Sequence, residues 1–156
     1  MEIATFGIIT RWNQVLLGVK RAEAEVGGSS LSGPGAKQQK NETLAQCLVR
    51  AAHNEAGILL NPRKLERVAV IVSYIVADVP DLELHVFHTS YFKDSPRETE
   101  TMTPCWYPVK DIPLQLMPEL DREWFLRAVQ GEKFRAHVYH RPRNKKPRVV
   151  FFPFFV

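Results

Sequence analysis

Cysteine is scarce in this 156-residue chain, which contains only Cys47 and Cys105. Two isolated cysteines cannot build a disulfide framework, and their spacing matches no metal-binding motif. Long apolar runs are also missing, since no stretch approaches the roughly 18 residues that a membrane-spanning helix needs. The first ten residues, MEIATFGIIT, lack the basic segment of a secretory leader. We therefore expect a cytoplasmic protein in a reducing compartment, with no membrane association.

Basic residues are unevenly distributed along the chain. The whole sequence carries a net charge of +4, yet residues 131–156 contain seven Lys or Arg and a single acid, Glu132. The rest of the chain is therefore net acidic. This asymmetry predicts an anionic partner at the loop 141–148 or, as the alternative, a solvated loop without a partner.

Two helices are well marked in the sequence. The segment 42–57, ETLAQCLVRAAHNEAG, pairs Thr43 with Gln46 as a capping box and ends at Gly57, which suits the left-handed conformation after a helix. The segment 118–131 begins with Pro118 and ends with Gly131, the usual order of these two residues around a helix. A long loop rich in Gly and Ser, residues 22–41, precedes the first helix.

Short β-rich runs surround these helices. Apolar or alternating segments predict strands at 2–10, 14–21, 65–76, 82–92, 104–109, 133–140 and 148–155. Strands interleaved with two helices predict an α/β (α+β) fold, in which helices pack on a mixed sheet, within a single domain of residues 1–156. Pro153 places the last strand at a sheet edge. An exposed edge could pair with a second copy, so we expect a monomer or a homodimer.

Residues 36–58 resemble the Nudix box, the signature of the Nudix hydrolase family. That signature is Gly, five residues, Glu, seven residues, and then Arg-Glu-apolar-x-Glu-Glu-x-Gly-apolar. The matching positions in this chain are Glu42, Arg50, Glu55, Gly57 and Ile58, with Ala36 at the first Gly. The segments VLLGVKR, GPGAK, ETL, LELHVFHTS, MTPCWYPVKDIPLQLMPELDREWF and EKFRAHV extend the resemblance to the animal-type MutT homologues, which are oxidised purine nucleoside triphosphate (8-oxo-dGTP) diphosphatases.

The resemblance implies an αβα sandwich and a loop-helix-loop that holds Mg²⁺ or Mn²⁺ against a substrate diphosphate. Carboxylates three and four positions apart share one helix face, so a single turn can present an oxygen-rich metal site. The candidate catalytic residues are Glu55, as metal ligand and base, and Arg50 with Glu42, which link the helix to the loop. The alternative for Glu55 is an exposed helix acid, and the alternative for Arg50 and Glu42 is a purely structural role.

The chain departs from this family at the metal site. Ala51 and Asn54 replace two of the three helix carboxylates, and Thr101 replaces an acid before the MTPCW segment. The remaining candidate metal ligands are Glu55, the backbone carbonyl of Ala36, and Glu100. One glutamate and an amide bind Mg²⁺ poorly, because this ion needs charged ligands or substrate phosphates. We expect Mg²⁺ or Mn²⁺ if the chain is active and no cofactor otherwise.

The resemblance also places a purine pocket beside the box. The candidate substrate-binding residues are Lys20, Ser32, Lys37 and Asp121. Leu120 replaces the first of two acids that read the base in the family, so Asp121 remains alone. Lys37 has a solvated surface role as its alternative.

Three hypotheses follow from these observations. The first is a nucleotide-binding protein of the Nudix fold that takes a purine nucleotide and whose diphosphatase activity is weak or lost. The second is an active Nudix hydrolase, a nucleoside di- or triphosphate diphosphatase with a metal site rearranged around Glu42, Glu55, Glu98 and Glu100. The third is an interaction module whose basic C-terminal hairpin binds RNA or an anionic protein surface.

Overall fold

The computed structural model describes residues 1–154 of the chain. Its strands are β1 (Glu2–Arg11), β2 (Gln14–Val19), β3 (Leu31–Ser32), β4 (Leu59–Leu60), β5 (Glu66–Tyr74), β6 (Leu82–Thr89), β7 (Phe92–Lys93), β8 (Cys105–Pro108), β9 (Phe134–Tyr139) and β10 (Arg148–Pro153). Its helices are α1 (Leu44–Ala56) and α2 (Glu119–Val129), with 3-10 turns at Pro62–Lys64, Val109–Asp111 and Leu114–Leu116. The predicted order of elements is confirmed. The strands β3, β4 and β7 were not predicted, because two residues are too few to show a period.

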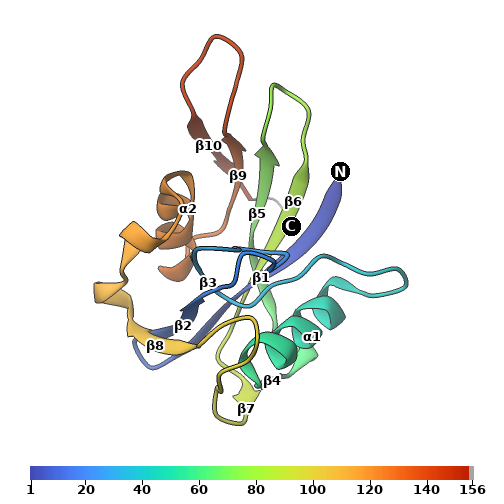
Figure 1. The fold of residues 1–156 in the computed structure, drawn as a ribbon, viewed down its shortest axis with the longest axis vertical. Helices are drawn as coiled ribbons and strands as arrows, with labels where there is room; N and C mark the ends of the chain where they lie inside the picture. The colour runs from blue at the N-terminus through green and yellow to red at the C-terminus, as the bar shows by residue number, and fades with distance from the viewer. Residues whose placement is uncertain (155–156) are drawn as a thin grey trace.

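One mixed sheet forms the centre of the fold (Figure 1). Its strand order is β10-β9-β5-β6-β1-β2-β3, and β8 pairs with β2. The pairs β1–β6 and β5–β9 are parallel, whereas β1–β2, β5–β6 and β9–β10 are antiparallel. The predicted mixed sheet is therefore confirmed, and the strand β10 that contains Pro153 lies at its edge as predicted.

The two helices cover opposite faces of the sheet. Successive residues of a strand point to opposite faces, so Phe6 and Ile8 of β1 belong to the core under α2, which contributes Trp124 and Phe125. On the other face, Leu48 of α1 packs in a second cluster that includes residues of β1, β2 and β6. A Cβ added at Gly7 would lie 3.1 Å from the Leu48 side chain, so this glycine permits the close approach of α1 to the sheet.

Local capping fixes the ends of α1 as the sequence predicts. The Thr43 hydroxyl accepts a hydrogen bond from the Gln46 amide at 3.0 Å, and the Gln46 side chain accepts one from the Thr43 amide at 2.8 Å. At the other end, Gly57 is left-handed with φ of 73° and its amide donates to the carbonyl of His53. The helix therefore presents a fixed face to the loop that precedes it.

Residues 34–36, near the end of the Gly-rich loop, pair with a part of β1 that β2 does not pair with. The amides of Thr5 and Gly7 donate to the carbonyls of Ala36 and Pro34, at 2.9 and 2.7 Å. A Cβ at Gly35 would lie only 2.2 Å from the Thr5 carbonyl oxygen, which explains the glycine there. This strand-like pairing brings the Gly35 amide to the face of α1.

The C-terminal strand ends earlier than the sequence pattern indicates. Strand β10 stops at Pro153, and residues 155 and 156 of the predicted apolar segment lie outside the described residues. Similarly, β5 ends at Tyr74 and β6 at Thr89, two or three residues before the predicted bounds. Within residues 1–154, neither helix has the length and apolar character needed to span a bilayer.

Candidate functional site

Arg50 and Glu42 clamp the loop to α1. The guanidinium of Arg50 donates to both carboxylate oxygens of Glu42, from Nε at 2.8 Å and from Nη2 at 3.0 Å. Nη2 also donates to the Lys37 carbonyl at 3.0 Å. The hydrogen bonds from Arg50 lower the pKa of Glu42 to about 2. Such a two-pronged pair is the strong form of an ion pair, and here it joins the loop to α1.

The Glu55 carboxylate is buried and engaged. Its Oε1 accepts a hydrogen bond from the Lys20 ammonium at 2.9 Å and another from the Gly35 amide at 2.8 Å. The same ammonium donates to the Val26 carbonyl at 2.9 Å. Burial lowers the pKa of Lys20, and the Glu55 carboxylate opposes part of this effect. The interpretation of Glu55 as an exposed helix acid is therefore wrong, because tertiary contacts bury its side chain.

A hollow of about 210 Å³ lies over this part of α1. The helix contributes Arg50, Ala51, Asn54 and Glu55, the loop contributes Glu23, Ala24, Glu25, Gly35 and Ala36, and Thr101 completes the lining. Ala51 packs in a small cluster with Ala36 and Cys47, and Asn54 is exposed. The positions at which the Nudix box has two further glutamates thus face this hollow with a methyl group and an amide.

The donor set in the hollow does not fit a divalent metal. The Ala36 carbonyl accepts from the Thr5 amide at 2.9 Å and from the Cys47 thiol at 3.3 Å, so its oxygen is already hydrogen-bonded and its role as a metal ligand stays a prediction. Glu100 lines a neighbouring hollow with Arg21, which shares Glu23, Ala24 and Thr101 with the hollow over α1, so a metal site shared by Glu100 and Glu55 stays a prediction. Residues 1–154 contain no cluster of three His, Cys, Asp or Glu side chains placed to hold a metal.

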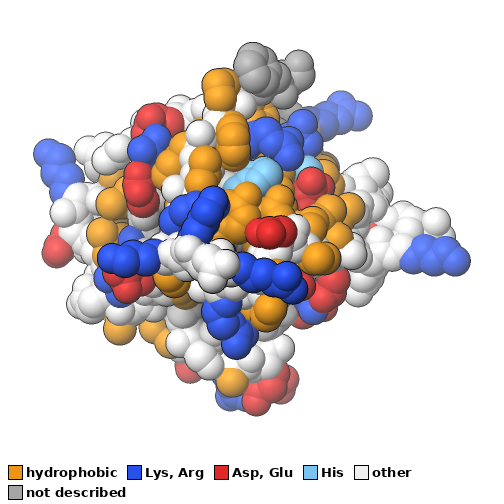
Figure 2. Space-filling view, turned by 90° about the horizontal axis from the view of Figure 1, so that it is seen from above, with side chains coloured by type: hydrophobic (Ala, Val, Ile, Leu, Met, Phe, Trp, Pro, Cys, Tyr) orange, Lys and Arg blue, Asp and Glu red, His pale blue; other side chains and the backbone are white. Residues whose placement is uncertain are grey.

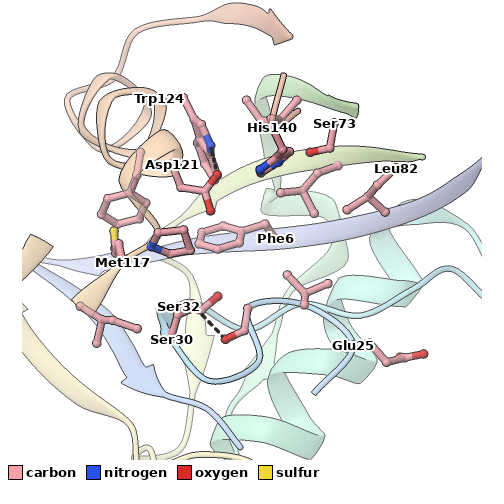
Figure 3. Close-up of a pocket in the computed structure, with 17 residues that line it drawn as sticks. Phe6, Glu25, Ser30, Ser32, Ser73, Leu82, Met117, Asp121, Trp124 and His140 are labelled. Atoms are coloured by element: carbon pink, nitrogen blue, oxygen red, sulfur yellow. Dashed lines mark hydrogen bonds between the residues drawn. The ribbon is translucent and has the colours of Figure 1, made fainter. Parts of the chain in front are cut away.

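A second cavity, of about 160 Å³, lies between the sheet and α2 (Figure 3). Asp121 and Trp124 of α2 lie on one side, Ser30 and Ser32 on the opposite side, and Phe6 between them. His140 and Ser73, also in the lining, lie at one end, where β5 and β9 finish. Its walls are mainly apolar, as small-molecule sites usually are.

Asp121 is the acid of this cavity. Its Oδ1 accepts a hydrogen bond from the Trp124 indole at 3.0 Å. Burial raises the pKa of Asp121, and this hydrogen bond and the nearby His140 oppose part of the shift. A carboxyl group with a raised pKa can be protonated at higher pH than usual, so it can donate as well as accept a hydrogen bond.

The predicted substrate-binding residues do not all lie together. Asp121 and Ser32 line the cavity, although the Ser32 hydroxyl donates to the Gly33 carbonyl at 3.0 Å. Lys20 lies outside the lining because it is buried against Glu55, and Lys37 forms an ion pair with Glu2 at 2.9 Å. Lys20 was expected in the pocket with Asp121, and Lys37 at a phosphate; neither lines this cavity, and their roles in substrate binding stay predictions.

Several residues of both cavities were missed by the sequence reasoning. Glu23 and Glu25 line the hollow, and Glu25 also lines the cavity at α2, so the two spaces adjoin there. The two acids of the AEAEV segment are visible in the sequence. They lie in a loop, however, and a loop has no regular period from which the direction of their side chains could be predicted. No sequence pattern indicates that Trp124 and His140 line one cavity, because only folding brings α2 next to the end of β9.

Comparison with known proteins identifies the family. Residues 1–128 match the NUDIX domain family. The chain belongs to the NUDIX domain family. Nudix proteins act on nucleotide substrates and generally use divalent metal ions. The departures at Ala51 and Asn54 are therefore departures of this Nudix chain from the chemistry of its own family.

Curated relatives point to one branch of the Nudix family. The chain is 29% identical over 137 residues to the oxidized purine nucleoside triphosphate hydrolase of Mus musculus, with 87% of this chain and 85% of the relative covered. It is 26% identical over 136 residues to the protein of the same name from Danio rerio, with the same two coverages of 87% and 85%. The chain is thus related to the oxidized purine nucleoside triphosphate hydrolases.

Solved structures show the same fold. The mutator MutT protein from Bacillus halodurans superposes with a TM-score of 0.79 at 17% identity, over 99% of this chain and 99% of that one. The MutT NUDIX hydrolase from Burkholderia pseudomallei gives a TM-score of 0.68 at 20% identity, over 83% of this chain and 95% of that one. The predicted Nudix fold is therefore confirmed.

Proposed function

We propose that this Nudix chain binds a purine nucleotide and that its diphosphatase activity is weak or lost. One observation carries the proposal: the last of the three helix carboxylates, Glu55, contacts the Lys20 ammonium and the Gly35 amide through the same oxygen. The positive charge next to Glu55 is thus supplied by the chain itself. A divalent ion would have to compete with a buried lysine that is already hydrogen-bonded.

The cavity at α2 supports a flat heteroaromatic ligand. Phe6 and Trp124 offer aromatic surface, and Asp121 offers a hydrogen-bonding group within the same lining. Aromatic walls bury the faces of a purine, while a single buried polar group can bind its edge and fix its orientation. The names of the curated relatives, which act on oxidized purine nucleotides, favour this class of ligand.

The charges of the adjoining hollow indicate which nucleotides bind best. Glu23, Glu25 and Glu55 all line it, and its one cationic lining residue, Arg50, is engaged by Glu42. Carboxylates repel phosphate groups unless a cation lies between them. We therefore expect that a nucleoside monophosphate binds at least as tightly as the corresponding triphosphate when no divalent metal is added.

The test compares GMP, 8-oxo-dGMP and their triphosphates by calorimetric titration, in EDTA and in Mg²⁺, with pyrophosphate release measured in parallel. We expect binding of the monophosphates in EDTA, little change of triphosphate affinity with Mg²⁺, and negligible turnover. Asp121→Asn should weaken binding, whereas the matched surface variant Asp111→Asn should not. Absence of binding by every purine nucleotide would contradict the proposal.

A second candidate function is supported by Glu23 and Glu25. Together with Glu55 they are three acids around one hollow, although they are not close enough in this conformation to form a metal cluster. An active Nudix diphosphatase could draw these loop acids around Mg²⁺ when a triphosphate binds. That function predicts a large rise of triphosphate affinity with Mg²⁺, accompanied by pyrophosphate release.

A further inference from the structure

Two hairpin loops project side by side at one end of the molecule (Figure 1). They are the β5–β6 loop, residues 75–81, and the β9–β10 loop, residues 140–147. The Ala77 amide donates to the Arg141 carbonyl at 3.2 Å, and the His140 amide donates to the Tyr74 carbonyl at 2.9 Å. These backbone hydrogen bonds join the loops into one surface, called the tip surface below.

The β5–β6 loop exposes aliphatic side chains. Ile75, Val76 and Val79 are 45%, 57% and 69% exposed. The turn is closed by Asp81, whose carboxylate accepts from the Ile75 amide at 2.6 Å and whose amide donates to the Ser73 carbonyl at 2.8 Å. The hydrogen-bonded turn therefore keeps three large apolar side chains, within five positions, exposed to solvent. Exposed apolar patches on a folded protein often mark a site where a partner binds.

The β9–β10 loop supplies cations beside these aliphatic residues. Arg141, Arg143, Lys145 and Lys146 are exposed, and none of them forms a salt bridge within the described part of the chain. The tip surface also contains the exposed acids Asp78 and Asp81, so four cations face two acids and an excess of positive charge remains. Seen from this end, Lys and Arg side chains lie beside an area of hydrophobic ones (Figure 2).

We propose that the tip surface docks on the headgroup region of an anionic lipid bilayer, with the aliphatic loop inserted and the basic loop at the headgroups. Membrane-surface binding combines buried apolar area with attraction to anionic lipids, and the tip surface offers both on adjacent loops. This proposal replaces the expectation of no membrane association, which was based on the absence of a spanning segment. It is independent of the proposed nucleotide function.

Single-stranded nucleic acid fits the same surface less well. Its bases need free aromatic faces for stacking. Tyr74 and Tyr139, beneath the tip surface, stack on each other at 4.5 Å between ring centroids, and the Arg148 guanidinium lies 4.4 Å from the centre of the Tyr139 ring. These ring faces are therefore already occupied. Exposed aliphatic residues add nothing to the binding of a polyanion, whereas a bilayer uses them.

The test measures co-sedimentation of the full chain with vesicles of phosphatidylcholine alone or with about one-third phosphatidylserine, where each cation near the surface strengthens binding roughly fivefold. We expect binding to the anionic vesicles only. Arg143→Gln with Lys146→Gln should weaken it roughly 25-fold on the same scale. Val76→Ser with Val79→Ser should weaken it severalfold.

Control variants remove the same number of charges, or an exposed apolar side chain, outside the tip surface. Arg63→Gln with Lys110→Gln and, separately, Leu116→Ser change residues that are exposed outside the tip surface, and they should leave vesicle binding unchanged. Circular dichroism checks that every variant folds. Two outcomes overturn the proposal: no preference for anionic vesicles, or vesicle binding that the valine variant retains in full. Tight binding of a single-stranded oligonucleotide that survives the valine variant, with no vesicle binding, would assign the surface to nucleic acid instead.

Discussion

Replacement of Lys20 by methionine tests the buried ion pair beside α1. Methionine keeps much of the length of the side chain but leaves Glu55 with the Gly35 amide as its remaining hydrogen-bond donor. At the observed separation of 2.9 Å the Lys20–Glu55 attraction amounts to roughly 6 kcal/mol at an effective dielectric near 20, before desolvation is subtracted. Removing one member of a buried pair costs about 3–5 kcal/mol. We expect Lys20→Met to lose stability on that scale.

Replacement of the other partner, Glu55→Gln, should lower the free energy of unfolding by less than Lys20→Met does. Glu55→Gln retains an oxygen that can accept from the Gly35 amide, and Lys20 can then lose its proton because burial already lowers its pKa. In the double variant Lys20→Met with Glu55→Gln, no charge is left unpaired. The double variant should therefore be less destabilised than the sum of the two single changes, with a coupling energy of about 1–3 kcal/mol.

Urea unfolding followed by tryptophan fluorescence measures these differences, since Trp124 is buried in the folded core. The stability that Lys20→Met is expected to lose is a large part of the roughly 5–15 kcal/mol that stabilises an ordinary domain. If Lys20→Met does not fold, the double variant is compared with Glu55→Gln instead. The reasoning is refuted if Lys20→Met unfolds within about 1 kcal/mol of the wild-type protein, or if the coupling energy is near zero.

Two further predictions concern titratable side chains. Because the hydrogen bonds from Arg50 depress the pKa of Glu42 to about 2, this contact stabilises the fold above pH 4.5 and its contribution disappears as pH falls from 4.5 to 2. Glu42→Gln should therefore cost about 1–3 kcal/mol at pH 7 and much less at pH 2, in urea unfolding at each pH. For Asp121 the pH dependence of stability has the opposite sign. Burial raises the pKa of this carboxyl group, so its ionisation destabilises the fold as pH rises. Asp121→Asn should raise the melting temperature at pH 8 relative to wild type, by less at pH 4, while it weakens nucleotide binding; a loss of stability at pH 8 would contradict this.

The sequence predicts best the features that depend on neighbouring residues. The capping box at Thr43, the left-handed Gly57 and the edge position of Pro153 follow from local chemistry, and the structure contains all three. The Glu42–Arg50 link was also foreseen, because the resemblance to the Nudix box fixed the spacing. Such features need no knowledge of how distant segments pack.

Contacts between distant segments could not be predicted in the same way. Lys20 and Glu55 are separated by 35 positions, and their contact exists because the loop after β2 folds over α1. The Ala36 carbonyl accepts from the Thr5 amide of β1, 31 positions earlier, and no local pattern indicates that contact. The exposure of Val76 and Val79 likewise depends on how the β5–β6 turn closes, which composition does not reveal.

The most direct test of the account is calorimetric titration of Mg²⁺ and Mn²⁺ into the ligand-free protein, beside the variant Ala51→Glu with Asn54→Glu. If Lys20 supplies the cation at Glu55, the wild-type chain should show no saturable metal binding below the millimolar range, whereas the two restored carboxylates should bring binding into the micromolar range. Micromolar binding by the wild-type chain would contradict the account.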